Sequence, residues 1–457
     1  MADAIQDFAA HVVGSSFDDL DPRTVANAKS FVLDTLGVGI GGSSGPMVQE
    51  LTGAIANAGR GEDARVWATG QCLPAQSAAL CNAYQIHNSE FDCLHEAAVA
   101  HVMTIVLPVA LAVAERAGSV SGRRLIEAVA LGVDVAAGIG VAATSGLRFF
   151  RPATAGAFGG VAALGKLMGL DRSKLVNAFS LAYGQMGGTM QAHTEGSLML
   201  AMQMGFNARN AVVACDLAVE GFTGPENILE GPFGYYRLIE DGGDPGAVAA
   251  KLGKVWRIDE LAYKPYPTGR ATHGIIDGCL TLQRSLDIEA TEIDRITARV
   301  PPLVNHLVGR PVKREMDINY ARLCATYVAA CALLRGTLGP EDFTEEAYSN
   351  AERQRLAGAI KVEAVEGDPN ALTPIEIEMS LRNGSVETLR LDDVYGAPAK
   401  PMSRAAVLEK FQGNCARSAG APNPEQAEAL IAAVDDLENL PDVTRLVDLM
   451  VPERANA

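Results

Sequence analysis

The chain has 457 residues, enough for two or three domains, and its 48% apolar and 20% charged residues are typical of a globular protein. Its 38 basic and 55 acidic residues give a net charge of −17, which argues against nucleic-acid binding. Gly and charged residues break the apolar runs before they reach membrane-spanning length, and the acidic N-terminus lacks a signal-peptide pattern. We therefore expect a cytoplasmic protein that binds neither nucleic acid nor membrane.

The first part of the chain, to about residue 265, reads as a succession of helices. Asp21-Pro22 supplies an N-cap followed by Pro at the first helical position, and Asp171 is the expected cap of a later helix. Residues 156–165 are apolar and rich in Gly and Ala, so we expect them at helix–helix contacts in the core. A phosphate-binding loop is the alternative, but no strand precedes this segment and no Gly-Lys-Ser/Thr follows it.

The pattern changes after about residue 268. Residues 359–365 and 374–381 alternate between apolar and polar, as strands do. Asn383-Gly384 then leads into residues 386–391, and Asn-Gly supplies the positive φ angles of a type I′ turn, which predicts a β-hairpin. Helices are expected between the strands, at roughly 274–285, 319–335 and 341–356.

Helical patterning returns at Ser403 and continues towards the C-terminus. The sequence therefore predicts a mainly α protein. A large, discontinuous all-helical domain, residues 1–268 plus 396–457, would carry an inserted α/β lid domain, residues 269–395. Clefts between domains are common ligand sites.

One polar stretch, His87 to His101, interrupts the apolar sequence and holds three of the seven histidines. Polar groups are costly to bury unless they are paired, so this stretch is a candidate site. Imidazole ordinarily titrates near neutrality, which makes His101 a candidate acid or base, with Asp92 as its orienting partner or as the base. The alternative for His101 is a core histidine that donates to a backbone carbonyl. The alternative for Asp92 is a helix cap.

The same stretch also suggests a metal site formed by His87, Glu90 and Asp92, but their spacing fits no zinc template. The eight cysteines are scattered through apolar contexts and form no Cys-x-x-Cys pair, which argues against an iron–sulfur cluster or structural zinc. We therefore expect neither a metal nor another cofactor.

A second polar stretch, Lys264 to His273, gathers basic residues around two prolines. Lys264 and Arg270 are candidate ligands for substrate carboxylates, since Arg suits bidentate contact. His273 is a candidate substrate ligand or a cap of the next helix. The alternative for the whole stretch is a polar loop between domains.

Several motifs follow one another in a specific order. They are Asn82 to Asp92, His101, Thr154-Ala-Gly-Ala-Phe-Gly159, Gly221-Phe-Thr-Gly-Pro225, Lys264-Pro-Tyr-Pro267 with Thr272-His273, and Tyr320 to Tyr327. This order resembles the MmgE/PrpD family, which includes 2-methylcitrate dehydratases and cis-aconitate decarboxylases, over nearly the whole chain. The resemblance implies a helical domain with an inserted α/β lid, an active site between them, and a homodimer.

The resemblance also implies an activity: a cofactor-independent lyase that dehydrates a small hydroxy di- or tricarboxylic acid by α-proton abstraction and loss of the β-hydroxyl. The alternatives are a decarboxylase of a cis-aconitate-like acid, an isomerase or epimerase of a related dicarboxylate, and a non-catalytic carboxylate-binding member. The implied catalytic residues are Asp92, His101, Lys264 and Tyr327. Asp92 matches the first residue of the family's Asp-Asp pair, whose second position is Cys93 here.

Two family motifs are changed in this sequence. Phe150-Arg151-Pro152 stands where the family often has His-Pro, which makes Arg151 a candidate replacement ligand for a substrate carboxylate. Residues 197–207 lack the family's Lys and its Leu-His pair, and His193 just before them is a candidate substitute. With Arg270 and His273, these residues form the expected substrate-binding set.

Overall fold

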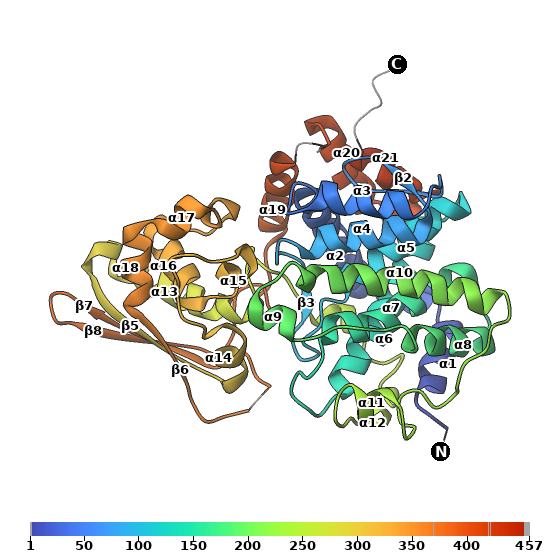
Figure 1. Cartoon of the computed structure of the whole chain (residues 1–457), viewed down its shortest axis with the longest axis horizontal. Coiled ribbons are helices and arrows are strands. Elements are labelled where there is room, and N and C mark those ends of the chain that lie inside the picture. The colour runs from blue at the N-terminus through green and yellow to red at the C-terminus, as the bar shows by residue number, and fades with distance from the viewer. Residues whose placement is uncertain (1, 369, 419, 421, 452–457) are drawn as a thin grey trace. The chain divides into compact units, whose positions relative to one another are not determined.

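A computed structural model describes residues 2–368, 370–418, 420 and 422–451 (Figure 1). The chain forms two compact units. One, here called the helical unit, comprises the chain up to Met190, Ala201–Leu261 and the chain from Ser403 on. The other, the mixed unit, comprises Gln191–Leu200 and Ala262–Met402, and so extends beyond the expected range 269–395. The expectation of a mainly α protein is confirmed.

The helical unit contains most of α10 (Met199–Val219), the short strands β1 (Ala64–Arg65), β2 (Cys72–Leu73) and β3 (Leu94–His95), and the helices α1 (Ile5–Gly14), α2 (Pro22–Gly42), α3 (Val48–Ala58), α4 (Ala75–His87), α5 (Met103–Ala117), α6 (Gly122–Ala142), α7 (Arg151–Met168), α8 (Arg172–Tyr183), α11 (Tyr235–Leu238), α12 (Pro245–Ala249), α19 (Arg404–Arg417), α20 (Pro424–Asp435) and α21 (Thr444–Met450). The expected caps Asp21 and Asp171 each accept a hydrogen bond from the backbone N–H three residues later.

The Gly- and Ala-rich segment 156–165 lies inside α7, which confirms its predicted place at a helix contact. A Cβ atom at Gly159 would lie 2.6 Å from the carbonyl oxygen of Gly132 in α6, so only glycine permits this approach of the two helices. Among the described helices, α6 alone is long and apolar enough to cross a membrane, but 89% of its apolar window is buried inside the protein. Such burial is typical of a core helix.

The mixed unit is built on a four-stranded sheet with the order β6-β5-β7-β8. The strands are β5 (Ile293–Val300), β6 (Ile360–Ala364), β7 (Ile375–Leu381) and β8 (Val386–Leu391), and β5–β6 is the parallel pair. Alternate residues of β7 are buried, as the sequence pattern predicts. A Cβ atom at Gly278 would lie 2.5 Å from Ile377, so α13 (His273–Leu286) packs closely on this sheet.

The β7–β8 hairpin confirms the expected pairing of these strands, but its turn differs from the predicted type I′. Of Asn383 and Gly384, only Gly384 has a positive φ, 91°. The N–H of Leu381 donates to the carbonyl of Ser385, so the loop is longer than the two residues a type I′ hairpin requires.

The remaining helices of the mixed unit are short. They are α9 (Gln191–Glu195), α14 (Pro302–Val308), α15 (Ile318–Arg322), α16 (Ala325–Arg335), α17 (Glu345–Ser349) and α18 (Ala351–Gly358). The single helix expected over 319–335 is thus divided into α15 and α16. The helix expected over 341–356 is divided into α17 and α18, because Asn350 caps a new helix with its side chain.

Candidate active site

The polar stretch between α4 and α5 folds around the fully buried carboxylate of Asp92. The Nδ1 atom of His87, the last residue of α4, lies 2.9 Å from Asp92 Oδ2. The Nδ1 atom of His101 lies 3.2 Å from the same oxygen. The two imidazole rings meet edge to face with centroids 4.8 Å apart. We call His87, Asp92 and His101 the His–Asp–His cluster.

Thr104, in the first turn of α5, donates its hydroxyl hydrogen to the same Asp92 oxygen. Burial alone would raise the pKa of Asp92, but the facing imidazoles of His101 and His87 outweigh it and hold this pKa well below its ordinary value. Asp92 is therefore ionised at neutral pH, and an ionised carboxylate only accepts hydrogen bonds. It accepts a hydrogen bond from Nδ1 of His87 and faces Nδ1 of His101 with the same oxygen.

The two histidines differ in exposure and in their second neighbours. The side chain of His87 is 1% exposed and that of His101 is 11% exposed. His87 Nε2 also lies 3.7 Å from Glu90 Oε1, so this ring stands between two carboxylates. His101 is therefore the member of the cluster that is better placed to exchange protons with a bound molecule.

The backbone of this loop contains two non-glycine residues in the left-handed region, Glu90 with φ 52° and Val99 with φ 48°. Each such residue costs roughly 1–3 kcal/mol, and strain of this kind concentrates at functional sites. The loop is anchored at His95, whose Nε2 lies 2.8 Å from Glu260 and whose Nδ1 accepts from the N–H of Ala98. These contacts hold the segment that leads into His101.

Arg151 anchors the same segment from α7. Its guanidinium donates from Nε and Nη2 to the two carboxylate oxygens of Glu240, both at 2.8 Å, and both side chains are buried. Further bonds run to the carbonyls of Ala98, at 3.3 Å, and Ser145, at 3.2 Å. Tyr235 also donates to Glu240. These contacts favour a positioning role for Arg151 over the expected role as a substrate ligand.

In the mixed unit, Lys264 is fully buried, two residues after the end of β4 (Leu261–Ala262). Arg270 donates to the carbonyls of Tyr395, at 2.7 Å, and of Tyr263, at 3.3 Å. Its Nη1 also lies 3.3 Å from Nδ1 of the buried His273. The structure thus brings Arg270 and His273 into contact. Arg270 also binds the carbonyl of the residue just before Lys264.

The two remaining predicted residues lie elsewhere in the mixed unit. Tyr327 is buried on α16, and its hydroxyl donates to the carbonyl of Asp342 at 2.6 Å. Burial raises the pKa of this phenol, so it is neutral at physiological pH. These contacts favour packing over the expected catalytic role. His193 lies on α9, where its carbonyl accepts from Arg310 at 3.2 Å.

Sequence reasoning did not assign a catalytic role to His87 or Thr104. Their nearness in sequence is the only signal, since His87 lies five residues before Asp92 and Thr104 lies three residues after His101. Side-chain direction decides their role, and spacing in an irregular loop does not predict direction.

The His–Asp–His cluster also has the spacing of a metal site, since its three potential ligand atoms lie within 4.8 Å of one another. Two imidazoles and one carboxylate suit several divalent transition metals. The hydrogen bonds of His87 and Thr104 to Oδ2 of Asp92, however, compete with a metal ion for the electron pairs of that oxygen. These bonds favour the acid–base interpretation.

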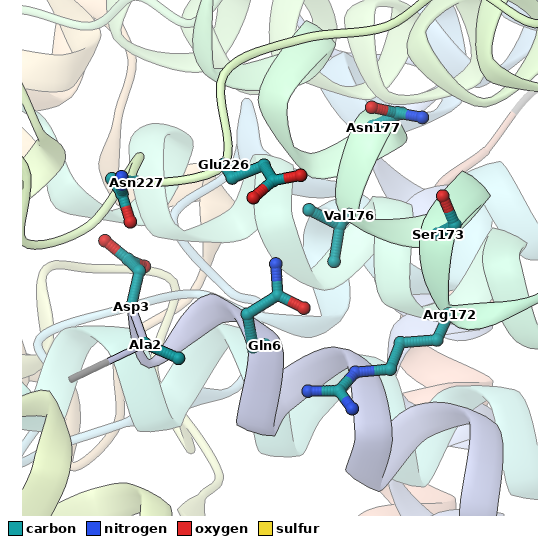
Figure 2. A pocket seen from close by; sticks show the side chains of 9 residues that line it. All are labelled: Ala2, Asp3, Gln6, Arg172, Ser173, Val176, Asn177, Glu226 and Asn227. Carbon is teal, nitrogen blue, oxygen red and sulfur yellow. The ribbon is translucent and has the colours of Figure 1, made fainter.

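A surface pocket of about 480 Å³ lies apart from the cluster in the helical unit, between α1, α8 and the chain at residues 226–227 (Figure 2). Asp3, Arg172 and Glu226 give it charges of both signs, and its lining includes none of the predicted site residues. Asp3 accepts hydrogen bonds from the N–H groups of Leu229 and Glu230, so its carboxylate fixes the chain there.

Comparison with known proteins identifies the family. The MmgE/PrpD N-terminal domain matches residues 6–247, and the MmgE/PrpD C-terminal domain matches residues 266–438. The cis-aconitate decarboxylase of Mus musculus is 26% identical over 97% of this chain and 93% of its own length. The human enzyme is 27% identical, over 97% and 94%, and that of Aspergillus terreus is 25% identical, over 95% and 93%. The resemblance seen in the sequence is confirmed, and the chain belongs to the MmgE/PrpD family.

Proposed function

We propose that this protein is a lyase that acts on a small di- or tricarboxylic acid, without a metal or organic cofactor. Family membership and the similarity to cis-aconitate decarboxylases support a lyase. The observation that carries the proposal is the buried Asp92 carboxylate, which faces two imidazoles through one oxygen. Such a carboxylate orients its imidazole and stabilises the imidazolium that forms when the ring accepts a proton.

We propose dehydration of a hydroxy acid as the reaction. Nε2 of His101 accepts the proton α to a carboxylate, and the electrons of that C–H bond form the carbon–carbon double bond. The imidazolium of His101 gives a proton to the β-hydroxyl, the C–O bond breaks, and water leaves. The transition state carries extra negative charge on the substrate carboxylate, which needs nearby donors or cations. Lys264 is the proposed cation, because a chain with a net charge of −17 needs local positive charge to attract an anion.

Decarboxylation of a cis-aconitate-like acid is the second candidate, and the names of the relatives favour it. In that reaction the carbon–carbon bond to a carboxylate breaks, carbon dioxide leaves, and the carbanion accepts a proton. His101 in its protonated form is the proposed donor. Isomerisation of a related dicarboxylate shares the carbanion. A non-catalytic protein that binds carboxylates is a further alternative, because two motifs of the family are changed in this chain.

A substrate panel tests the proposal. Hydroxy di- and tricarboxylates and unsaturated tricarboxylates are incubated with the protein, and double-bond formation by ultraviolet absorbance and release of carbon dioxide are followed. We expect turnover of at least one acid and a loss of roughly 10²-fold or more in kcat for His101→Ala. His306→Ala is the matched control, because His306 is an exposed histidine of α14 in the mixed unit.

Each outcome of the panel has a defined meaning. Double-bond formation assigns a dehydratase, and carbon dioxide release assigns a decarboxylase. Binding of panel acids without turnover, measured by calorimetry, assigns the protein to the non-catalytic alternative. Equal loss of activity in His306→Ala and His101→Ala would contradict the role given to the cluster. We also propose a homodimer, which sedimentation equilibrium tests.

A further inference from the structure

A buried ion pair lies directly beside the segment that carries Asp92. Lys410, on α19, places its Nζ 2.7 Å from Oδ1 of Asp34, on α2, and the two side chains are only 4% and 1% exposed. The same Nζ donates to the carbonyl oxygen of Phe91 at 2.8 Å and lies 4.2 Å from the centre of the Phe91 ring. Phe91 is the residue immediately before Asp92.

Fold stability alone gives little reason for this pair. Removing two charges from water is costly, and replacing a buried ion pair by apolar residues of similar volume is often neutral or stabilising. The helices that carry the pair already pack tightly, since a Cβ atom at Gly37 of α2 would lie 2.7 Å from the ring of Phe411 in α19. The buried ammonium of Lys410 also donates to the Phe91 carbonyl, and this contact fixes the chain next to Asp92.

Cys93 follows Asp92 in the chain, and the charges of the pair and of Asp92 act on its thiol. Cys93 is fully buried beside Asp92, and burial, with the charges of Asp34 and Asp92, raises the pKa of its thiol well above the ordinary value, whereas Lys410 acts in the opposite direction. The charges on both sides of residue 93 are therefore close enough to act on one side chain. A shift of the chain at residues 91–93 would move Asp92 relative to His101.

We propose that the Asp34–Lys410 pair is a positioning device, in which Lys410 fixes the Phe91 carbonyl and thereby holds the Asp92 carboxylate against the imidazoles of the cluster. The expected effect of Lys410 on catalysis rests on the proposed function. Its expected effect on the position of Asp92 does not. The C-terminal segment thus contributes to the site through a residue that does not touch the substrate. Lys410 is a positioning residue and not a catalytic one.

The decisive variant is Lys410→Met, which keeps most of the stem and removes the donor. Its readout is proton NMR of the histidine ring N–H groups, because a ring N–H that bonds to a buried carboxylate gives a downfield signal that exchanges slowly with water. Signals of the wild type are assigned with His87→Gln and His101→Gln. We expect Lys410→Met to lose or shift both assigned signals, and Lys410→Arg, which keeps donors, to restore them in part.

Lys166→Met is the matched control, since Lys166 also pairs with a carboxylate, Glu127, and donates to the carbonyl of Ser15 in the helical unit. It should leave the assigned signals unchanged. If Lys410→Met does not fold, Asp34→Asn/Lys410→Met replaces it, because this double variant leaves no buried unpaired charge and still lacks the donor to Phe91. Wild-type signals in either folded variant would overturn the proposal.

With a substrate from the panel, Lys410→Met should lower kcat by roughly 10- to 100-fold and change KM by less than a few-fold, as expected for a misplaced catalytic group. An unchanged kcat together with shifted signals would overturn the role of the cluster in catalysis and leave the positioning inference standing. Unchanged signals overturn the positioning inference whether or not turnover is found. The two failures are therefore distinguishable.

Discussion

Replacing Arg151 by Met separates a positioning role from a substrate-binding role. Arg151 forms two 2.8 Å bonds with Glu240, and both side chains are buried, so the variant leaves a buried carboxylate without its counter-ion. Breaking a buried pair by removing one partner costs about 3–5 kcal/mol. The lost bonds to the carbonyls of Ala98 and Ser145 act in the same direction.

A loss of this size is measurable by thermal unfolding. At about 2 °C per kcal/mol, the lower end of the range for domains of 150–250 residues, it corresponds to a decrease of roughly 6–10 °C in Tm. The double variant Arg151→Met/Glu240→Leu should recover part of this loss, because no buried charge is left without a partner. Differential scanning fluorimetry of the wild type, both single variants and the double variant measures the coupling.

A substrate-binding role for Arg151 predicts a different result. If Arg151 binds a substrate carboxylate, as expected from its place in the changed family motif, Arg151→Met should keep the wild-type Tm and raise KM. A Tm within about 1 °C of the wild type, with no coupling to Glu240, would refute the positioning role, since the 3–5 kcal/mol penalty of a broken buried pair is far larger.

Three other predictions are independent of Arg151. Lys264→Met should lower kcat/KM by roughly 10- to 150-fold, because a charge-assisted contact contributes about 1.5–3 kcal/mol. A fully active variant would show that the stem of the side chain matters and not its charge. Seven of the eight cysteines are buried, and burial raises the pKa of Cys93 well above its ordinary value, so this thiol is protonated near pH 8. Only Cys72, which is partly exposed, should react quickly with a thiol reagent in the folded protein, and fast modification of Cys93 would contradict the described burial. Turnover should survive exhaustive treatment with EDTA, and a loss that zinc, iron or manganese restores would establish a metal at the His–Asp–His cluster.

The sequence predicted most of the elements because their signals are local. The caps at Asp21 and Asp171 and the alternation of 374–381 depend on residues within one turn or one strand. The turn at Asn383-Gly384 was predicted wrongly, because the dipeptide fits both a two-residue loop and a longer one, and the register of the neighbouring strands decides between them.

Only part of the candidate site's geometry can be read from the sequence, for a physical reason. Asp92 and His101 are near in sequence, and their pairing follows from the cost of burying polar groups in an apolar region. The partners of Arg151 and Tyr327 are set by tertiary contacts, Glu240 for the first and the carbonyl of Asp342 for the second. Local patterns do not reveal such contacts. Lys410, more than 300 residues from Phe91, shows the same limit.

In the proposed reaction His101, oriented by Asp92, exchanges a proton with the α-carbon of a small carboxylic acid. Solvent deuterium incorporation detects this exchange: panel acids are incubated with the protein in deuterium oxide, and deuterium at the α-carbon is measured by NMR or mass spectrometry. We expect incorporation with the wild type and His306→Ala, and a rate at least about 10²-fold lower with His101→Ala. Equal rates in His101→Ala and the wild type, or no incorporation into any acid that binds, would contradict the account.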